Sequence, residues 1–410
     1  IVGVIGIATS FVLLGGPSLD GIKRFSYSYL TSFCFILTIC LGCLFFVTVM
    51  HLTRAGWSVT VRRIAEIYAA CLPALLILFL PILIPVLFQF DWVYSWVTAG
   101  WSIHGSQEAK DAVLGAAENA PPLEALKAAY LNPGFFGIRT VVYFFIWWLM
   151  SSFFLRNSLK QDQTGDKALT LKMQKWSAPM MIMFAATLTF ASFDYEMSLS
   201  PLWFSTMFPV YIFAGGFLGG LATMTLTALM LQRSGRVTDE ITVEHYHDLA
   251  KLMFAFVFFW GYIAFSQFML IWYANIPEET FWFAWRINQL PGQEGLSGWQ
   301  YFSLFLVFGH IIIPFLGLMA RTVRRSKSFL FFAAIYILII HWIDHYWIIM
   351  PEAFGDHRFT FSGLGVVADL ACAVGLIGLF MAIFFIVCSN KPLVPLRDPR
   401  LGESLNFHNP

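Results

Sequence analysis

Charged residues are scarce in this chain. Asp, Glu, Lys and Arg make up 12% of its 410 residues, whereas a typical soluble domain carries about 25%. So few charges cannot build a water-soluble surface, a disordered segment or a nucleic-acid-binding face, and the net charge of +1 favours no anionic partner. Hydrophobic residues instead reach 58%. The composition predicts a protein that lives in a lipid bilayer and binds no nucleic acid.

Motifs that hold redox cofactors are also lacking. The six cysteines lie in or beside apolar stretches, where a thiol usually packs as a small hydrophobe. Cys40 and Cys43 form a CxxC pair, but Leu44 follows where covalent haem attachment needs histidine. The paired histidine spacing of a dihaem cytochrome is absent. These spacings therefore indicate neither covalent haem attachment nor a dihaem site.

Long apolar runs fill most of the sequence. A membrane-spanning helix needs about 20 mostly apolar residues, and these runs are continuous rather than alternating as in a barrel strand. Ten runs qualify, namely 1–15, 27–50, 64–88, 135–154, 177–191, 202–231, 249–272, 301–320, 329–349 and 361–387. The pattern predicts an all-α integral membrane protein with ten transmembrane helices.

Basic residues set an orientation. If the helices alternate in direction, 18 of the 25 Lys and Arg residues fall on one side, which the positive-inside rule assigns to the cytoplasm. Both termini are then cytoplasmic, and 388–410 is a cytoplasmic tail. Two long loops, 91–133 and 276–298, lie on the outer side.

A weak internal repeat organises the single membrane domain, 1–410. Each half contains four helices, starts from the outer side and carries a Trp-containing outer loop after its second helix. We expect two four-helix bundles, 27–196 and 202–351, flanked by the first helix and by the last, 361–387.

Ionisable residues cluster in the second half. His341, Asp344 and His345 have i, i+3, i+4 spacing and share one face of the ninth helix, and His310 and Asp369 lie at a comparable depth on its neighbours. Such residues are costly in a membrane and mark function. We expect the five to converge in the outer half. A proton relay suits Asp and His; a structural hydrogen-bonded network and metal or haem ligation are the alternatives.

The first half offers fewer candidates. Asp194 and Glu196 close the fifth helix at the depth where Arg139 enters the fourth. An Arg–carboxylate pair there is charge-assisted, and it suits either a structural ion pair or a proton acceptor. Glu66, near the inner end of the third helix, could be an inner proton entrance or could simply pair with a neighbouring arginine.

Three segments resemble one family of respiratory proteins. They are 193–206 (FDYEMSLSPLWFST), 265–280 (FSQFMLIWYANIPEET) and 344–351 (DHYWIIMP). Together they are similar to the ActF-type membrane subunits of Alternative Complex III, a quinol:electron-acceptor oxidoreductase. The wider group is the NrfD-like, polysulfide-reductase-type membrane subunits.

The resemblance implies a place in the bacterial cell inner membrane and in the respiratory chain. It implies partners: a paralogous NrfD-like subunit, an iron–sulfur subunit and c-type cytochrome subunits, which carry the clusters and haem c. It also implies a subunit without a redox centre of its own, with a role in proton translocation or in association with a quinone (menaquinone or ubiquinone). Because no histidine is expected within the helices of the first bundle, proton handling or scaffolding is favoured over quinol oxidation by this chain.

Two functions from other classes remain open. A secondary transporter can be built from parallel repeats, and a purely structural scaffold subunit can be polar inside.

Overall fold

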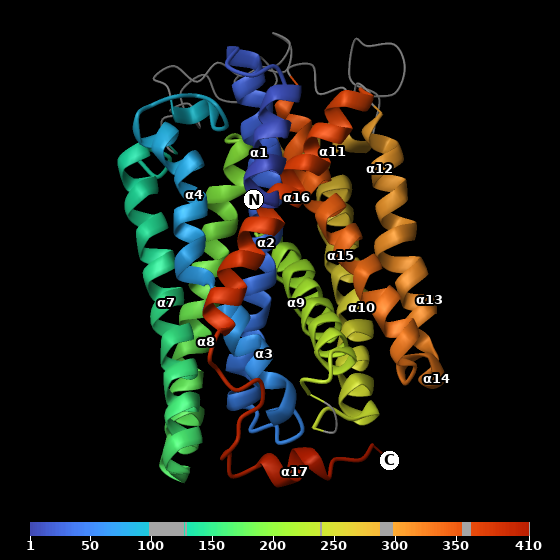
Figure 1. The fold of residues 1–410 in the computed structure, drawn as a ribbon. Helices are drawn as coiled ribbons and strands as arrows, with labels where there is room; N and C mark the ends of the chain where they lie inside the picture. Colours follow the sequence, from blue (N-terminus) through green and yellow to red (C-terminus); the bar gives the residue numbers. More distant parts are fainter. Residues whose placement is uncertain (98–126, 128, 238–239, 288–297, 355–361, 410) are drawn as a thin grey trace.

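The computed structural model describes residues 1–97, 127, 129–237, 240–287, 298–354 and 362–409, and within these ranges every regular element is a helix (Figure 1). Much of the two expected outer loops, 98–126 and 288–297, lies outside the described residues. In the described part, nine spans are long and apolar enough to cross a membrane. The chain is therefore an all-helical, multi-pass membrane protein.

The nine spans consist of single helices or of helices joined end to end. They are α2 (Leu19–Leu52), α3 with α4 (Val59–Ala69, Leu72–Leu87), α7 (Pro133–Thr164), α8 with η2 (Lys167–Tyr195, Met197–Leu199), α9 (Phe208–Arg233), α10 (Val243–Ala274), α12 with η3 and α13 (Trp299–Leu306, Val307–Ile312, Ile313–Met319), α15 with η4 (Lys327–Ile349, Met350–Ala353) and α16 (Gly363–Cys388).

Shorter helices complete the described fold. They are α1 (Val2–Leu13), η1 (Ser95–Val97), α11 (Pro277–Ile287), α14 (Arg321–Arg324) and α17 (Leu401–Leu405). The first expected span, 1–15, is α1, which has 12 residues. At 1.5 Å per residue it reaches about 18 Å, short of the roughly 30 Å hydrocarbon core of a bilayer. It packs along α16.

Local sequence signals set both the start of α7 and the turn from α7 to α8. The Phe135 amide donates to the Asn132 side chain at 2.9 Å, and Pro133 opens α7, a combination favoured at helix N-termini. Gly165 ends α7 in the left-handed conformation, with φ of 70°, and Asp166 immediately caps α8. Two residues therefore reverse the chain.

Two prolines interrupt apolar runs that each form a single span, at positions where proline is expected to kink a helix. The run 64–88 divides into α3 and α4 because Pro73 has no N–H to donate to the Ala69 carbonyl. In the same way Pro314 cannot bond to the carbonyl of His310, and the preceding segment η3 widens into a π-helix. His310 thus lies in a distortion of the kind often found at functional sites.

The α2 helix lies at the centre of the fold. It packs against α3, α4, α8, α9, α15 and α16, and 89% of its most apolar stretch is buried. Its closest approach is to α9, where a Cβ atom built on Gly42 would lie 2.3 Å from the Gly216 carbonyl oxygen. Gly216 and Gly220, one of the two GxxxG spacings of α9, therefore form a close-packing face against α2.

Replacing Gly42 with Ala is expected to destabilise the protein by about 1–3 kcal/mol or more, because backbone rather than a flexible side chain must move. Gly317→Ala is the matched control: its new Cβ would meet the Phe329 ring at an ordinary 3.5 Å. Thermal unfolding of both variants in detergent checks this expectation. Equal melting temperatures would show that the α2–α9 contact is looser than described.

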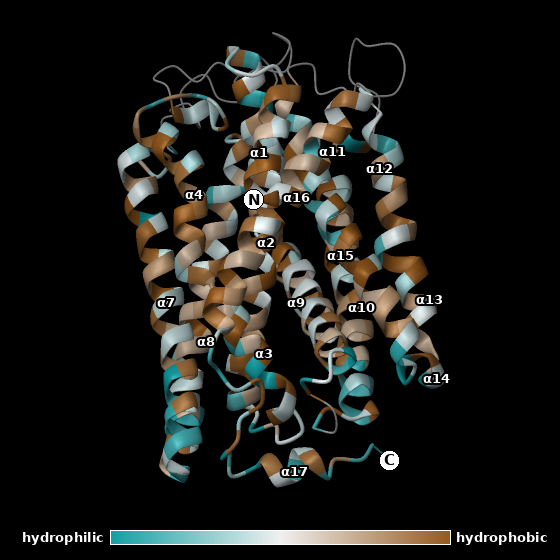
Figure 2. Cartoon of the chain, viewed as in Figure 1, coloured by the Kyte–Doolittle hydropathy of each residue, from teal (hydrophilic) through white to brown (hydrophobic). Residues whose placement is uncertain are grey.

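The two ends of the helices differ in polarity. The lower end, as drawn in Figure 1, carries α14, α17 and the start of α3, whereas α11 lies at the upper end. Figure 2 shows hydrophilic residues at the lower ends of α7 and α10 and hydrophobic residues along the middle of the helices. The described tail, 389–409, lies across the lower end, where α17 contacts α3.

Candidate functional site

The three candidate residues of α15 lie on one face near its upper end, as their spacing predicts. His341, Asp344 and His345 are all buried. Their partners come from α2, α9, α10 and the end of α8. We call these three residues, together with Thr38, Glu196, Tyr211, Trp260 and His310, the polar cluster.

One branch of the polar cluster runs from α8 to α15 through α2. His345 contacts the Glu196 carboxyl through Nδ1 at 3.1 Å and the Thr38 hydroxyl through Nε2 at 3.1 Å. The same hydroxyl contacts Nε2 of His341 at 3.1 Å. The sequence places Glu196 beside Arg139; in the structure it instead joins the two halves of the chain.

Proton counting constrains this branch. The Thr38 hydroxyl has one proton, and it also lies 2.9 Å from the Cys34 carbonyl oxygen. At least one of the two facing Nε2 atoms must therefore carry a proton. The His345–Glu196 contact likewise needs a proton on one partner, because two lone pairs form no hydrogen bond. The contacts make a continuous hydrogen-bonded chain from Glu196 to His341.

The second branch surrounds Asp344. The Tyr211 hydroxyl donates to one carboxyl oxygen, and Trp260 Nε1 donates to the other at 3.2 Å. The His310 ring stacks on Trp260 with a centroid separation of 3.7 Å. Neither nitrogen of His310 has a hydrogen-bond partner among the described residues. A buried imidazole normally has a hydrogen-bond partner, which a water molecule can supply.

Glycines on α9 make room for the cluster. A Cβ on Gly219 would lie 2.8 Å from the His341 ring, and one on Gly216 would lie 2.9 Å from Thr38. Larger residues at either position would separate His341 from Thr38. Gly219 belongs to the GxxxG pair Gly215/Gly219 and Gly216 to the pair Gly216/Gly220, so glycines of both pairs bring the cluster together.

Asp369 lies apart from the polar cluster, contrary to the expected convergence of five residues. Arg24 donates to its carboxyl at 2.6 Å and the Tyr346 hydroxyl at 2.9 Å. Within the described ranges no hydrogen bond joins it to His341 or His345. The reason is electrostatic. A buried carboxylate is stabilised by pairing with a cation, and Arg24, near the start of α2, lies at the same depth as Asp369.

Arg139 and Asp194 form the expected ion pair in the first half. Two guanidinium nitrogens of Arg139 each donate to one Asp194 oxygen at 2.8 Å, and Tyr143 donates to the same carboxyl at 2.7 Å. All three side chains are buried. Asp194 therefore has a full set of partners, as in a structural pair.

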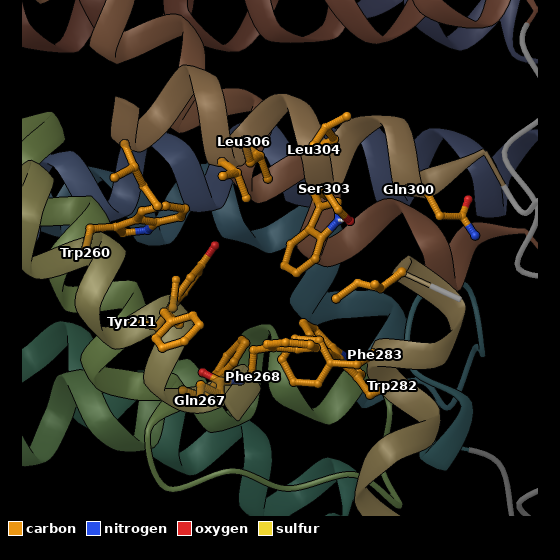
Figure 3. A pocket seen from close by; sticks show the side chains of 17 residues that line it. Tyr211, Trp260, Gln267, Phe268, Trp282, Phe283, Gln300, Ser303, Leu304 and Leu306 are labelled. Carbon is orange, nitrogen blue, oxygen red and sulfur yellow. Dashed lines mark hydrogen bonds between the residues drawn. The ribbon is translucent and has the colours of Figure 1, made fainter. Parts of the chain in front are cut away.

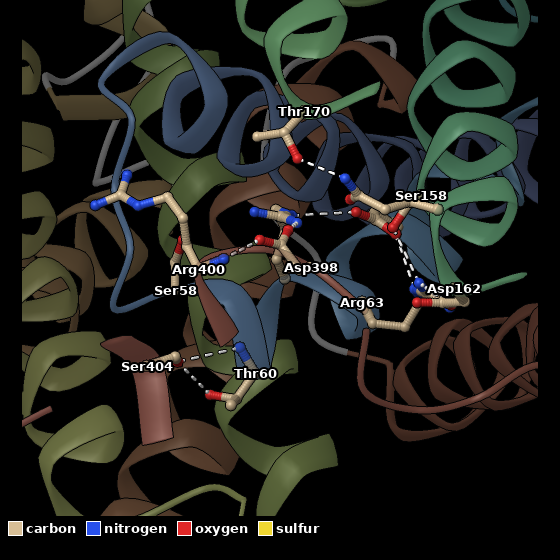
Figure 4. Close-up of polar contacts among 12 residues, drawn as sticks. Ser58, Thr60, Arg63, Ser158, Asp162, Thr170, Asp398, Arg400 and Ser404 are labelled. Atoms are coloured by element: carbon tan, nitrogen blue, oxygen red, sulfur yellow. Dashed lines mark hydrogen bonds and ion pairs between the residues drawn. The ribbon is translucent and has the colours of Figure 1, made fainter. Parts of the chain in front are cut away.

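Glu66 is held at the lower end, far from the polar cluster. Arg62 and Arg63 donate to its two oxygens at 3.2 and 2.9 Å. Figure 4 shows the surrounding contacts, in which Arg63 also reaches Asp162 at 2.7 Å.

His51 lies in the last turn of α2, where its ring stacks on Phe154. The expectation that the helices of the first bundle lack histidine is therefore wrong.

A cavity of about 580 Å³ adjoins the polar cluster on the side of α10, α11 and α12. Tyr211 and Trp260 form the wall that separates it from Asp344. Figure 3 shows Tyr211 and Gln267 on one side of the cavity and Ser303 and Leu304 on the other. This cavity could not be predicted from the sequence, because its lining comes from six elements.

Arg286 holds in place the wall of the cavity that α11 forms. Its guanidinium lies over the Trp282 ring at 3.6 Å and donates to the Ile348 carbonyl at 2.8 Å. Burial lowers the pKa of Arg286 to about 10, against the opposing effect of Glu352, so it remains charged at neutral pH. The charge fixes α11 onto the end of α15.

No protein-family model matches the chain, and no curated protein matches it. Among the described residues, no group of three or more His, Cys, Asp or Glu side chains is arranged to hold a metal ion. The geometry of the polar cluster therefore carries the functional conclusion.

Proposed function

We propose that this chain is a proton-relaying membrane subunit of a bacterial respiratory quinol:electron-acceptor oxidoreductase of the Alternative Complex III type. The observation that carries the relay is the polar cluster itself. Titratable side chains from the end of α8, from α15 and from η3, in contact with Thr38, Tyr211 and Trp260, meet in the buried interior. Hydrocarbon cannot satisfy such groups, and Asp, Glu and His are the groups that transfer protons in membranes.

The proposal includes a topology and a location. The subunit lies in the inner membrane with ten helices, α1 included, arranged as two four-helix bundles flanked by α1 and α16, and with both termini in the cytoplasm. Helices of each group pack against one another, as α7 does on α8 and α9 on α10 and α15, and α2 of the first bundle packs along α9 of the second, so the two bundles share an extensive interface. The redox centres belong to the partners: haem c and iron–sulfur clusters in separate subunits.

Purification under mild conditions tests membership of such a complex. A tagged full-length chain, extracted from its native membrane, is expected to co-purify with c-type haem and iron–sulfur proteins. An untagged strain taken through the same steps controls for carry-over. A chain that purifies alone, without a haem Soret band or iron, would contradict the proposal and favour an autonomous transporter.

A further inference from the structure

The lower ends of α7 and α8 form a hairpin that carries five exposed cations. Within the described residues none of them forms an ion pair or a side-chain hydrogen bond; they are Arg156, Lys160, Lys167, Lys172 and Lys175. We call these five residues the basic patch. The two carboxylates of the hairpin do not neutralise it, because Asp162 pairs with Arg63 and Asp166 caps the first turn of α8.

Other cations at the lower end are neutralised by the chain itself. Acidic side chains form ion pairs with Arg62, Arg63, Lys251, Arg325 and Arg400. The basic patch therefore differs from its surroundings, since it presents positive charge that no acidic side chain of the described residues balances.

Packing of α7 on α8 brings the cations of the basic patch together. Phe153, Arg156 and Lys160 have i, i+3, i+7 spacing and share one face of α7. The Lys172 ammonium of α8 lies 5.6 Å from the centre of the Phe153 ring, so Lys172 lies beside that face. Lys175 follows one turn later on α8. Both helices therefore contribute to the same patch.

The basic patch lies where the apolar runs end. The run 135–154 ends just before Arg156, and the run 177–191 begins just after Lys175. Between them Trp176 is 49% exposed, and exposed tryptophan favours the level of the lipid head groups. Leu149 and Ile182, further into the membrane, are also exposed, as expected of side chains that contact acyl chains. The cations therefore lie in the head-group layer.

We propose that the basic patch binds the head group of an anionic phospholipid. Clusters of Lys and Arg beside a membrane span attract phosphate groups, and the guanidinium of Arg156 can bind a phosphate through two nitrogens. The acyl chains then lie along the exposed apolar side chains of α7 and α8. Because five cations on two helices can serve two phosphates, cardiolipin is the strongest ligand expected. The inference requires a membrane-spanning chain and does not rest on the proposed respiratory function.

Native mass spectrometry of the full chain, purified in detergent and titrated with cardiolipin, measures this binding. Arg156→Gln with Lys172→Gln is expected to weaken binding about thirtyfold, at about fivefold for each cation. Arg233→Gln with Arg236→Gln is the matched control. It removes two exposed cations from the same end of the molecule, one of which also lies over a ring, that of Phe331, and it is expected to leave the affinity unchanged.

A single variant keeps the test decisive if the double variant fails to fold. Lys160→Gln changes an exposed side chain without a partner among the described residues, and it is expected to weaken binding about fivefold. Lys160→Arg keeps the charge and is expected to bind as wild type does. Added salt is expected to weaken binding to wild type, because exposed charges are screened.

Three results would overturn the site. Equal weakening by the two double variants would show that the lipid responds to net charge alone. Phosphatidylethanolamine that binds as tightly as cardiolipin would show that the charge of the head group is not recognised. A lysine-directed cross-linker that joins Lys160 to an acidic protein in native membranes would assign the basic patch to that partner instead.

Discussion

Replacing Asp344 with Asn is expected to lower turnover-coupled proton release by about tenfold or more, while the complex still assembles. Asn keeps the shape of the side chain but cannot take up or release a proton, and a positioned acid or base commonly contributes at least that factor. Tyr211 and Trp260 both donate hydrogen bonds to the Asp344 carboxyl. No other carboxyl on that branch can take up or release a proton in its place.

The substitution also has a small structural cost. The Asn oxygen accepts from Trp260 Nε1 and its amide group donates to the Tyr211 hydroxyl, which can accept as well as donate, so neither partner is left without a hydrogen bond and the cost is about 1 kcal/mol. Proton release is measured with an external pH indicator on the whole complex in liposomes, alongside electron transfer. Asp91→Asn, at a half-exposed carboxylate paired with Lys23, is the matched control. A lower melting temperature with unchanged proton release would indicate a purely structural network.

Replacing Arg139 with Met is expected to destabilise the protein by about 3–5 kcal/mol, because it leaves the Asp194 carboxylate buried without its cation. Adding Asp194→Asn is expected to recover most of that loss. The amide still accepts the Tyr143 hydroxyl, and no unpaired charge remains.

Thermal unfolding of the single and double variants in the same detergent measures both effects. Lys23→Met breaks a half-exposed pair with Asp91 and is expected to cost less than about 1 kcal/mol. A double variant as unstable as Arg139→Met would show that packing, rather than the charge, is the cause.

The sequence predicted the parts of the fold that depend on one helix at a time. Apolar length located the nine spans, and the i, i+3, i+4 spacing placed His341, Asp344 and His345 on one face. The pairing of Arg139 with Asp194 was also predictable, because both lie near the same end of adjacent helices.

Contacts that depend on helix rotation could not be predicted. The depth of Glu196 was clear, but not that it faces His345 rather than Arg139. Depth along the helix groups Asp369 with the histidines. In the structure Arg24, at the same depth, forms an ion pair with the Asp369 carboxyl instead. Nothing in the sequence marked Tyr211, Trp260 or Thr38 as partners, since each belongs to a helix full of similar residues.

The most direct test of the relay is the number of protons released per electron by the assembled complex carrying both Asp344→Asn and His341→Ala. These changes remove titratable groups from both branches of the polar cluster. If the cluster relays protons, the double variant releases far fewer protons per electron than wild type. An unchanged ratio in a fully assembled complex would contradict the relay and leave the cluster a structural network.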